Sequence, residues 1–485
     1  MIKSIIYLLS ALALFVVATM IFPLIVSLLY HENQWKIFLG CIIIFSVILA
    51  IPVFLIRRKS IEITNRVALA VACIGWFIIP LISAVPFIIS GEIGGFLDSY
   101  FEAISGFTTT GASILPKPEI VSHGILFWRS FIQWLGGMGI ILLGIALFAF
   151  FPGSSFHLYK AEVPGPTKDE KFFPKISTLA RVLWITYTII TLLEIALLWV
   201  GGMNLFDSFC HSFTTMATGG FSTKSASISY WESPFIQIVI IVFMVLAGTN
   251  FSLHFTIFKH KGLGYFKDAE FRMYIAIMFV STIVLRLFPL SQWKLEETGK
   301  FLLNNSFQVV SIMTTTGFSN CDFEKWKDIS PVSEILLVTL MFIGGMQSST
   351  GGGIKVARIL ILLKLLLREI KLIIHPKAIH KIKIMEREVT DDTLNRVSSF
   401  FFFYMLIFVI SSLLISFAGV DIETSLSSVA ACLNNIGPGF GAVGAMDNYS
   451  SLPVPAKWIL IFDMVTGRLE LFTVIVAFFP SFWKK

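Results

Sequence analysis

The 485-residue sequence is poor in charge, since Asp, Glu, Lys and Arg together make up only 14% of it. It also lacks clusters of metal-binding or catalytic side chains, because its five cysteines have no paired spacing and its eight histidines are scattered. These absences argue against a disulfide framework, a zinc site and an enzyme. No glycine fingerprint for a nucleotide follows a strand, so any effect of a nucleotide must come through a partner.

Apolar residues are abundant instead, at 56% of the chain. They form runs longer than the roughly 20 residues that cross a hydrocarbon core, which predicts a membrane protein with many spans. The formal net charge of +7 then reflects basic cytoplasmic loops and predicts no binding to nucleic acid. The first apolar run, Ile5 to Leu29, lacks a small-residue cleavage signal and is interpreted as a retained helix.

A hexapeptide rich in threonine and glycine occurs four times in altered form between apolar segments. The copies are Thr108 to Ser113, Ala217 to Ser222, Thr314 to Ser319 and Ile436 to Gly441. Aligned on the glycine before an aromatic residue or alanine, they give Gly111, Gly220, Gly317 and Gly439. A second glycine follows each of these at a nearly constant spacing, at Gly137, Gly248, Gly345 and Gly467. This regularity indicates four copies of one structural unit.

Each unit is predicted to contain an outward helix, a short helix, the Thr/Gly loop and an inward helix. The inward helices of units one, two and four are predicted at Gly124 to Phe150, Phe235 to Phe258 and Trp458 to Phe479. The short helices, such as Phe96 to Phe107, cannot span a bilayer and are typical of re-entrant segments. An opening hairpin, Ile5 to Leu29 and Ile37 to Ile56, precedes the units. We therefore predict an all-α membrane protein with ten transmembrane helices: a pseudo-fourfold assembly of four helix–pore-helix–filter-loop–helix units plus an N-terminal helix hairpin. The predicted boundaries are 1–60 for the hairpin and 61–152, 153–260, 261–385 and 386–485 for units one to four.

The distribution of basic residues predicts the orientation. Most of the 37 Lys and Arg lie at the termini or in loops that join one unit to the next, beginning with Arg57, Arg58 and Lys59. The positive-inside rule places both termini in the cytoplasm and the Thr/Gly loops toward the outside. The most basic stretch, Lys355 to Arg396, either contacts membrane lipid phosphates or docks a cytosolic partner, and the sequence leaves both interpretations open.

The Thr/Gly loops are candidates for an ion filter. Non-helical backbone is tolerated in a membrane only where it is buried in protein or lines a wet cavity. Four such loops around one axis would present rings of carbonyl oxygens to a cation, as potassium channel filters do. The alternative is four tight turns, and the repeated spacing favours the filter. The predicted cation-binding residues are Thr109, Thr110, Gly111, Thr218, Gly219, Gly220, Thr315, Thr316, Gly317, Gly437, Pro438 and Gly439.

The short helices share a polar residue at a fixed distance before the loop glycine: Asp98, Asp207 and Asn304. A residue of this type at a helix start suits N-capping and the positive end of the helix dipole. The negative end of the helix would then point at the Thr/Gly loop and favour a cation there. Capping alone would explain these residues equally well.

The four units, each with one filter glycine, resemble the superfamily of Trk, Ktr and HKT potassium and sodium transporters. The opening hairpin and the loop sequences are most similar to its bacterial TrkH branch, and the resemblance covers essentially the whole chain. It implies potassium uptake by a homodimer in the bacterial cytoplasmic (inner) membrane. It also implies regulation by a cytosolic TrkA-like ring, so that a nucleotide acts only through this partner subunit.

The loops also suggest which ion is carried. A glycine in all four loops resembles the potassium-preferring members, so potassium is the expected transported and filter-bound ion, with rubidium tolerated. The loops depart from fourfold symmetry, however, because Ala112 stands where the alignment gives Phe221, Phe318 and Phe440. A single shared glycine per loop implies fewer carbonyl rings than in a potassium channel.

The third inward segment contains Gly344, Gly345, Gly351, Gly352 and Gly353. Each would cost a helix interior roughly 1 kcal/mol, which predicts a break into a polar loop rather than a kink. The resemblance implies that this loop is a gate. The predicted gating residues are these five glycines together with Gln347, Ser348, Thr350, Lys355 and Arg468.

Arg468 lies well inside an apolar segment, where an arginine costs about 3 kcal/mol on insertion scales. It should therefore face the protein interior, either in an ion pair with Asp463 or Glu470 or as a positive charge in the pore. The resemblance favours the pore. Arg129 and Arg286 lie near helix ends and are interpreted as residues that extend toward the membrane surface.

Two modes of transport remain open. The leading hypothesis is a gated pore in which the membrane potential drives cations inward. The alternative is a proton- or sodium-coupled potassium symporter, in which Glu194, the one acid of its apolar segment, is a candidate coupling group.

Overall fold

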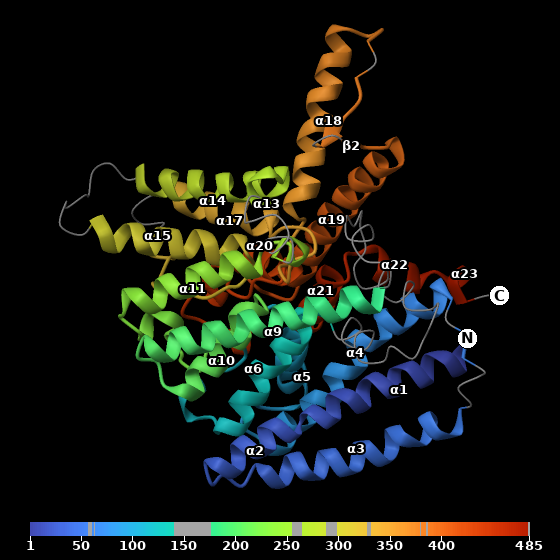
Figure 1. The fold of residues 1–485 in the computed structure, drawn as a ribbon, viewed down its shortest axis with the longest axis vertical. Helices are drawn as coiled ribbons and strands as arrows, with labels where there is room; N and C mark the ends of the chain where they lie inside the picture. The colour runs from blue at the N-terminus through green and yellow to red at the C-terminus, as the bar shows by residue number, and fades with distance from the viewer. Residues whose placement is uncertain are drawn as a thin grey trace.

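The computed structural model describes residues 1–56, 61–62, 64–139, 176–254, 264–287, 298–326, 331–378, 380–384 and 387–483. Within these ranges the regular structure is helical apart from one short β-hairpin (Figure 1), which confirms the predicted all-α class. The predicted cytoplasmic turn at Arg57, Arg58 and Lys59 lies outside the described residues, as does the predicted inward helix of unit one beyond residue 139.

The opening hairpin consists of α1 (Ile2–Thr19) and α2 (Ile21–Leu29), which together form one span, and α3 (Trp35–Leu55). The first span packs on α3. Its helix α1 also contacts α4 (Asn65–Ser90) of unit one, and its helix α2 contacts α6 (His123–Gly137) of the same unit. The outer face of α3 leaves Phe54 and Leu55 exposed, as expected for side chains that face lipid.

The four units follow the predicted order of elements. Unit one comprises α4, α5 (Phe96–Phe107) and α6, and unit two comprises α9 (Ile176–Val200), α10 (Leu205–Met216) and α11 (Pro234–Ala247). Unit three comprises α13 (Gly264–Lys267), α14 (Ala269–Leu287), α15 (Thr298–Met313), α17 (Pro331–Ile343) and α18 (Val356–Ile374). Unit four comprises α19 (Asp391–Phe417), α20 (Ile422–Leu433), α21 (Val454–Arg468), α22 (Phe472–Phe478) and α23 (Pro480–Trp483).

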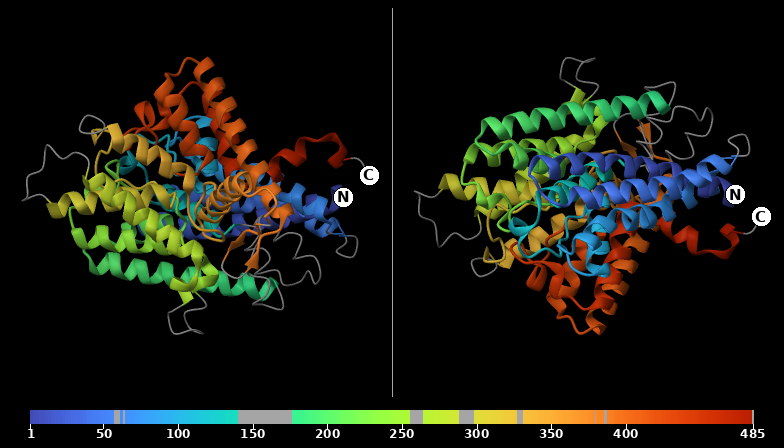
Figure 2. Two further views of the ribbon diagram at one scale, coloured as in Figure 1. Left: turned by 90° about the horizontal axis from the view of Figure 1, so that it is seen from above. Right: turned by 90° about the horizontal axis from the view of Figure 1, so that it is seen from below.

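Both termini lie at the same end of the molecule, on the right in Figure 1 and in both views of Figure 2. Five described segments are long and apolar enough to cross a membrane: Ile2–Leu29, Trp35–Leu55, Asn65–Ser90, Ala180–Val200 and Asp391–Phe417. Shared placement of the termini agrees with an even number of crossings.

The inward helices end at or beside the second-series glycines in all four units. Gly137 is the last residue of α6, Gly248 caps α11, and α21 ends one residue after Gly467. The expectation of single inward helices from Phe235 to Phe258 and from Trp458 to Phe479 is therefore wrong. A Cβ at Gly248 would lie 3.1 Å from Cγ2 of Thr314, so the helix end sits directly against a filter loop.

A basic segment in unit three projects beyond the membrane helices. Figure 1 shows α18 extending beyond the rest of the molecule, and the hairpin of β1 (Lys383–Ile384) and β2 (Arg387–Glu388) follows it. A small second core of Ile361, Ile382 and Leu394 holds α18, the hairpin and α19 together. This hairpin has no counterpart in the sequence-based prediction.

Candidate functional site

The four Thr/Gly loops leave their short helices with one common backbone conformation. α5, α10, α15 and α20 end at Phe107, Met216, Met313 and Leu433. The second residue beyond each helix end has positive φ: 55° at Thr109, 53° at Thr218, 60° at Thr315 and 55° at Asn435. The glycine two positions later is also left-handed, with φ of 78° at Gly111, 72° at Gly220, 80° at Gly317 and 102° at Gly437.

This register corrects the alignment of the fourth loop, in which Gly437 and not Gly439 is the equivalent glycine. The amide of Ile436, which precedes Gly437, donates to the carbonyl of Ala431 at 2.8 Å. The same bond runs from Thr110 to Ser105 at 2.9 Å in the first loop. The alignment was wrong because it took Phe440 as the marker, whereas the backbone places Pro438 after the fourth glycine.

Gly437 completes a closed ring of four glycines. A Cβ added to any of them would collide with the backbone of the next loop, so only glycine fits at these left-handed, closely packed positions. The contacts run in order around the ring: Gly111 against Gly219, Gly220 against Thr316, Gly317 against Ile436, and Gly437 against Thr110. We call Gly111, Gly220, Gly317 and Gly437 the glycine ring.

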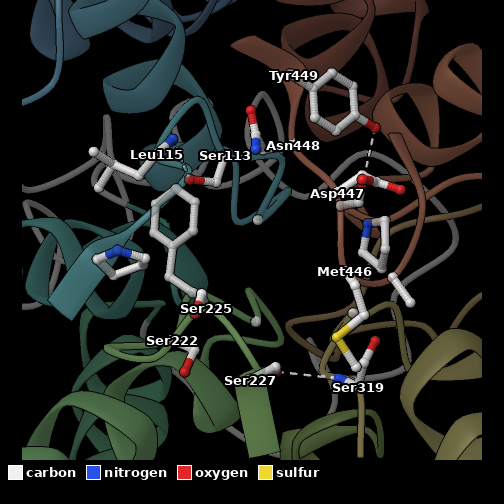
Figure 3. A pocket seen from close by; sticks show the side chains of 18 of the residues that line it. Ser113, Leu115, Ser222, Ser225, Ser227, Ser319, Met446, Asp447, Asn448 and Tyr449 are labelled. Atoms are coloured by element: carbon white, nitrogen blue, oxygen red, sulfur yellow. Dashed lines mark hydrogen bonds between the residues drawn. The ribbon is translucent and has the colours of Figure 1, made fainter. Parts of the chain in front are cut away.

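The four glycines of the ring line a hollow of about 90 Å³, which we call the mouth. Figure 3 shows side chains that surround it. All four units contribute to its wall, with Ser113, Ser222, Ser319 and Asn448 among the polar residues. The Tyr449 hydroxyl donates to the carbonyl of Gly437 at 2.6 Å, and the Ser319 amide donates to Ser227 Oγ at 3.2 Å. The mouth is thus a partly polar recess with the backbone of all four filter loops in its lining.

Glu119 lies in η2 (Pro118–Ile120), outside the spanning segments, and binds Ser225 of the mouth wall. Its carboxylate accepts from the amide and hydroxyl of Ser225 at 2.7 and 2.8 Å. Partial burial opposes the charged form, but these bonds outweigh it and hold the pKa of Glu119 below its ordinary value.

Threonine hydroxyls form hydrogen bonds within and between the filter loops. Thr108 and Thr110 share a hydroxyl bond of 2.8 Å, as do Thr314 and Thr316. The Asn435 amide donates to Thr110 Oγ1 at 2.9 Å, which joins the fourth loop to the first. Gly439, by contrast, lies away from the ring, where its amide donates to the carbonyl of Val443 at 2.7 Å.

The polar residues of the short helices are placed differently from the prediction. Asp98 and Asp207 lie in the first turns of α5 and α10, near the positive end of the dipole, but the capping positions belong to Gly95 and Asn204. Asn304 lies inside α15. N-capping by these three residues is therefore wrong.

The predicted break in the third inward segment is present, since α17 ends at Ile343 and α18 begins at Val356. We call residues 344–355 the glycine loop. The loop lies against the third filter loop, because the Gly352 amide donates to Thr315 Oγ1 at 2.7 Å. It is anchored to unit two by the Thr350 hydroxyl, which donates to the carbonyl of Ala247 at 3.0 Å, and by the Met346 amide, which donates to Gly248 at 2.9 Å.

The remaining predicted gating residues secure this loop. The Gln347 amide donates to Glu270 at 2.7 Å, and the Ser348 carbonyl accepts from the amide of Phe251 at 3.2 Å. The ammonium of Lys355 donates to the carbonyl of Gly351 within the loop. A Cβ at Gly344 would meet Gly352 and Gly353, so the two ends of the loop lie close together.

Arg468 connects the glycine loop to the first filter loop. Its Nη1 donates to the Thr350 carbonyl at 2.7 Å and to Thr109 Oγ1 at 3.2 Å. Its Nη2 donates to the carbonyls of Gly136 and Gly137, both at 2.7 Å. The two acids expected beside it have other partners, because Glu470 pairs with Arg358 and Asp463 accepts from Ser411 at 2.7 Å.

Arg129 contradicts its predicted role as a residue that extends toward the membrane surface. It is only 2% exposed and pairs with Glu102 at 2.6 Å beside the mouth. Sequence reasoning missed Glu102, although an acid inside a short apolar helix was a usable signal. Arg286 is partly exposed in the last turn of α14. Glu194 is fully buried in α9, and its predicted role in coupling stays untested.

Comparison with known proteins identifies the family. The sequence profile of the TrkH family, described as a cation transport protein, matches residues 33–485. The Trk system potassium uptake protein TrkH of Escherichia coli strain K12 is 40% identical over 473 residues and that of Halomonas elongata is 38% identical over 474, each alignment covering 96% of both chains. The crystal structure of the potassium transporter TrkH from Vibrio parahaemolyticus covers 100% of both chains with a TM-score of 0.89 at 34% identity. The chain therefore belongs to the TrkH family of cation transport proteins, which are membrane transporters and not enzymes.

Proposed function

We propose that the chain takes up potassium across the bacterial cytoplasmic membrane through a gated, potassium-selective pore that also passes rubidium. The observation that carries this proposal is the closed glycine ring beneath a polar mouth. Peptide carbonyls at such a ring can replace part of the hydration shell of a cation. The names of the related proteins, which are Trk system potassium uptake proteins, support potassium as the ion.

The proposed ion ligands are backbone carbonyls of the four filter loops. They belong to 109–111, 218–220, 315–317 and 435–437. In the fourth loop Gly437 stays from the sequence-based set, and residues 435 and 436 take the place of Pro438 and Gly439. Potassium is the substrate of this site. A hydrogen bond from Asn435 to Thr110 joins the fourth loop to the first, and each ring glycine packs against the backbone of the next loop, so the ring can keep one diameter while an ion passes.

The glycine loop and Arg468 are the proposed gate. Thr315 and Thr109 link this gate to the filter loops, through the Gly352 amide and through Arg468. A guanidinium beside the pathway raises the energy of a cation there, because like charges repel strongly in a poorly solvated interior. Movement of the glycine loop would break the bond from Arg468 to Thr350 and release the charge from its present position.

Control from the cytoplasm is the proposed role of the basic segment. In this arrangement both termini are cytoplasmic, and α18 and the β-hairpin form the surface on which a TrkA-like ring docks. α18 continues directly from the glycine loop, so a pull on the helix reaches the gate. A nucleotide would act only by changing this partner. Assembly as a homodimer in membrane lipid belongs to the same proposal.

Coupled symport is the second candidate, and the burial of Glu194 inside a spanning helix favours it. An intramembrane acid is a common element of proton relays. The reversal potential separates the two candidates, because a pore follows the potassium gradient alone. A shift of the reversal potential with external pH or sodium at constant potassium would support symport.

Rubidium flux into vesicles that contain the purified protein tests the proposal. We expect uptake that depends on the protein and is inhibited more strongly by potassium than by sodium. The variant Gly220→Ala should abolish this uptake, and Gly40→Ala, where an added Cβ meets nothing within 4 Å, should not change it. A wild-type protein that transports no alkali cation under any condition would overturn the proposal.

A further inference from the structure

Arg129 connects the first two filter loops from a buried position in α6. Its Nε donates to Oε1 of Glu102 at 2.6 Å, and its Nη2 donates to Ser113 Oγ at 3.0 Å. Its Nη1 donates to the carbonyl of Ser222 at 3.0 Å. Ser113 and Ser222 each lie two residues beyond a ring glycine, so one guanidinium holds equivalent points of two adjacent loops.

Glu102, the other member of the ion pair, binds the first filter loop. Its carboxylate is completely buried in α5 and accepts from Ser113 Oγ at 3.0 Å and from the Ile114 amide at 2.7 Å. The guanidinium carbon of Arg129 also lies 3.6 Å above the ring of Phe221, which follows the second ring glycine. The contacts of the pair therefore converge on residues that flank Gly111 and Gly220.

The other short helices carry a different side chain at the position of Glu102. These residues are His211, Gln308 and Ser428, each nine residues before its ring glycine. His211 Nε2 lies 3.0 Å from Ser222 Oγ, and Gln308 Nε2 donates to Asn320 Oδ1 at 3.1 Å, so each of these two binds its own loop. The charged connection between loops is a feature of the first two units.

A buried, multiply bonded ion pair is stiff, because any displacement leaves a charge without compensation in a medium of low dielectric constant. Stiffness matters at a filter, since loops that can approach each other coordinate a smaller ion better. We propose that the Arg129–Glu102 pair fixes the separation of the first two filter loops and thereby sets the discrimination between potassium and sodium. Both are positioning residues that act through the backbone, and the inference rests on the proposed function.

The test replaces both members of the pair by neutral amide side chains, Arg129→Gln with Glu102→Gln, so that no unpaired charge remains buried. Purified wild type and double variant are reconstituted in vesicles, and the potassium to sodium permeability ratio is taken from reversal potentials. We expect the double variant to conduct rubidium while this ratio falls about tenfold, the change that corresponds to the loss of one charge-assisted hydrogen bond.

The matched control is Lys457→Gln with Asp98→Asn, which removes another ion pair of α5. Lys457 Nζ lies 2.8 Å from Asp98 and 2.9 Å from the Ser450 carbonyl, away from the ring. A purely structural role would lower the melting temperature of both double variants and leave the permeability ratio of both intact. We expect the ratio to change only in the Arg129 and Glu102 variant.

The outcomes separate this inference from the proposed function. A wild type that moves no alkali cation overturns both. A selective wild type whose ratio survives in the double variant overturns the inference alone. If the double variant does not fold, Arg129→Lys decides, because lysine keeps the charge but cannot bridge three partners with one planar group. A lower ratio in Arg129→Lys supports the inference, and an unchanged ratio overturns it.

Discussion

The glycine ring and the glycine loop both contain left-handed glycines, all four in the ring but only Gly344 and Gly353 in the loop, and they differ in symmetry. The ring repeats one conformation in all four units, with each glycine packed against the next loop. The long glycine loop occurs in unit three, where it is tied to its surroundings by hydrogen bonds from Gly352, Thr350 and Arg468. Repetition suits a site that surrounds an ion, and a single asymmetric loop suits an element that must move.

The glycine ring and the glycine loop also differ in the interactions that resist a substitution or a displacement. A side chain at the ring collides with neighbouring backbone, which cannot yield without disturbing the next loop. The glycine loop is held by individual hydrogen bonds, each with a modest net contribution of about 1 kcal/mol. Substitutions should therefore abolish transport at the ring and release transport at the loop.

The largest effect is expected at the glycine ring, and Gly437→Ala tests it there with Gly439→Ala as its matched control. Left-handed backbone costs a side chain roughly 1–2 kcal/mol before the collision with the first filter loop is counted. We expect rubidium uptake to fall at least about tenfold for Gly437→Ala, since a tenfold change corresponds to about 1.4 kcal/mol. Gly439 does not have positive φ, and a Cβ there would meet the side chains of Ser427 and Val443 at 3.0 Å instead of another filter loop, so its variant should retain most of the uptake. The reverse order would restore the original alignment of the fourth loop.

Arg468→Ala should have the next largest effect, in the opposite direction. The substitution removes a positive charge and the bonds by which Arg468 joins Thr350 of the glycine loop to Thr109 and to the end of α6. Basal rubidium uptake should rise several-fold, and Arg468→Lys, which retains the charge, should rise less. Unchanged uptake at normal expression would show that Arg468 has only a structural role.

Thr315→Val should give a smaller increase in basal uptake. Valine has the shape of threonine but cannot accept the hydrogen bond from the Gly352 amide, so the glycine loop loses one attachment. One neutral hydrogen bond corresponds to an increase of up to about fivefold. Thr316→Val is the control, because its hydroxyl bonds Thr314 within the filter loop. Equal effects of the two variants would contradict a specific link between loop and ring.

The smallest effect is expected for Glu119→Gln at the edge of the mouth. The pKa of Glu119 is lower in the folded protein, so its stabilising contribution is complete above the ordinary pKa of a glutamate and is lost as the pH falls through the lowered value. The variant should melt slightly earlier than wild type at neutral pH and at the same temperature at pH values below the lowered pKa. A difference that persists in acid would exclude this origin.

The sequence predicted the parts of the fold that depend on local patterns. Apolar runs and recurring glycines gave the order of helices and loops, because both signals lie within short windows of sequence. The register of the fourth loop required the backbone itself, since Phe440 imitates the aromatic residue that follows Gly220 and Gly317 while Pro438 occupies its place.

Long-range partners were the other limit of prediction. Arg129 and Glu102 are 27 residues apart and meet only because α5 and α6 pack together, so burial of Arg129 could not be read from its position near a helix end. The early ends of α11 and α21 likewise depend on contacts of Gly248 and Gly467 with neighbouring loops. The constant spacing identified these glycines as part of a repeat but did not predict which residues they contact.

The position of a bound rubidium ion tests the central claim most directly. We predict anomalous scattering from rubidium on the common axis of Gly111, Gly220, Gly317 and Gly437, within coordination distance of carbonyls from all four filter loops. Rubidium bound elsewhere in a transporting protein, with nothing between these four glycines, would contradict the account.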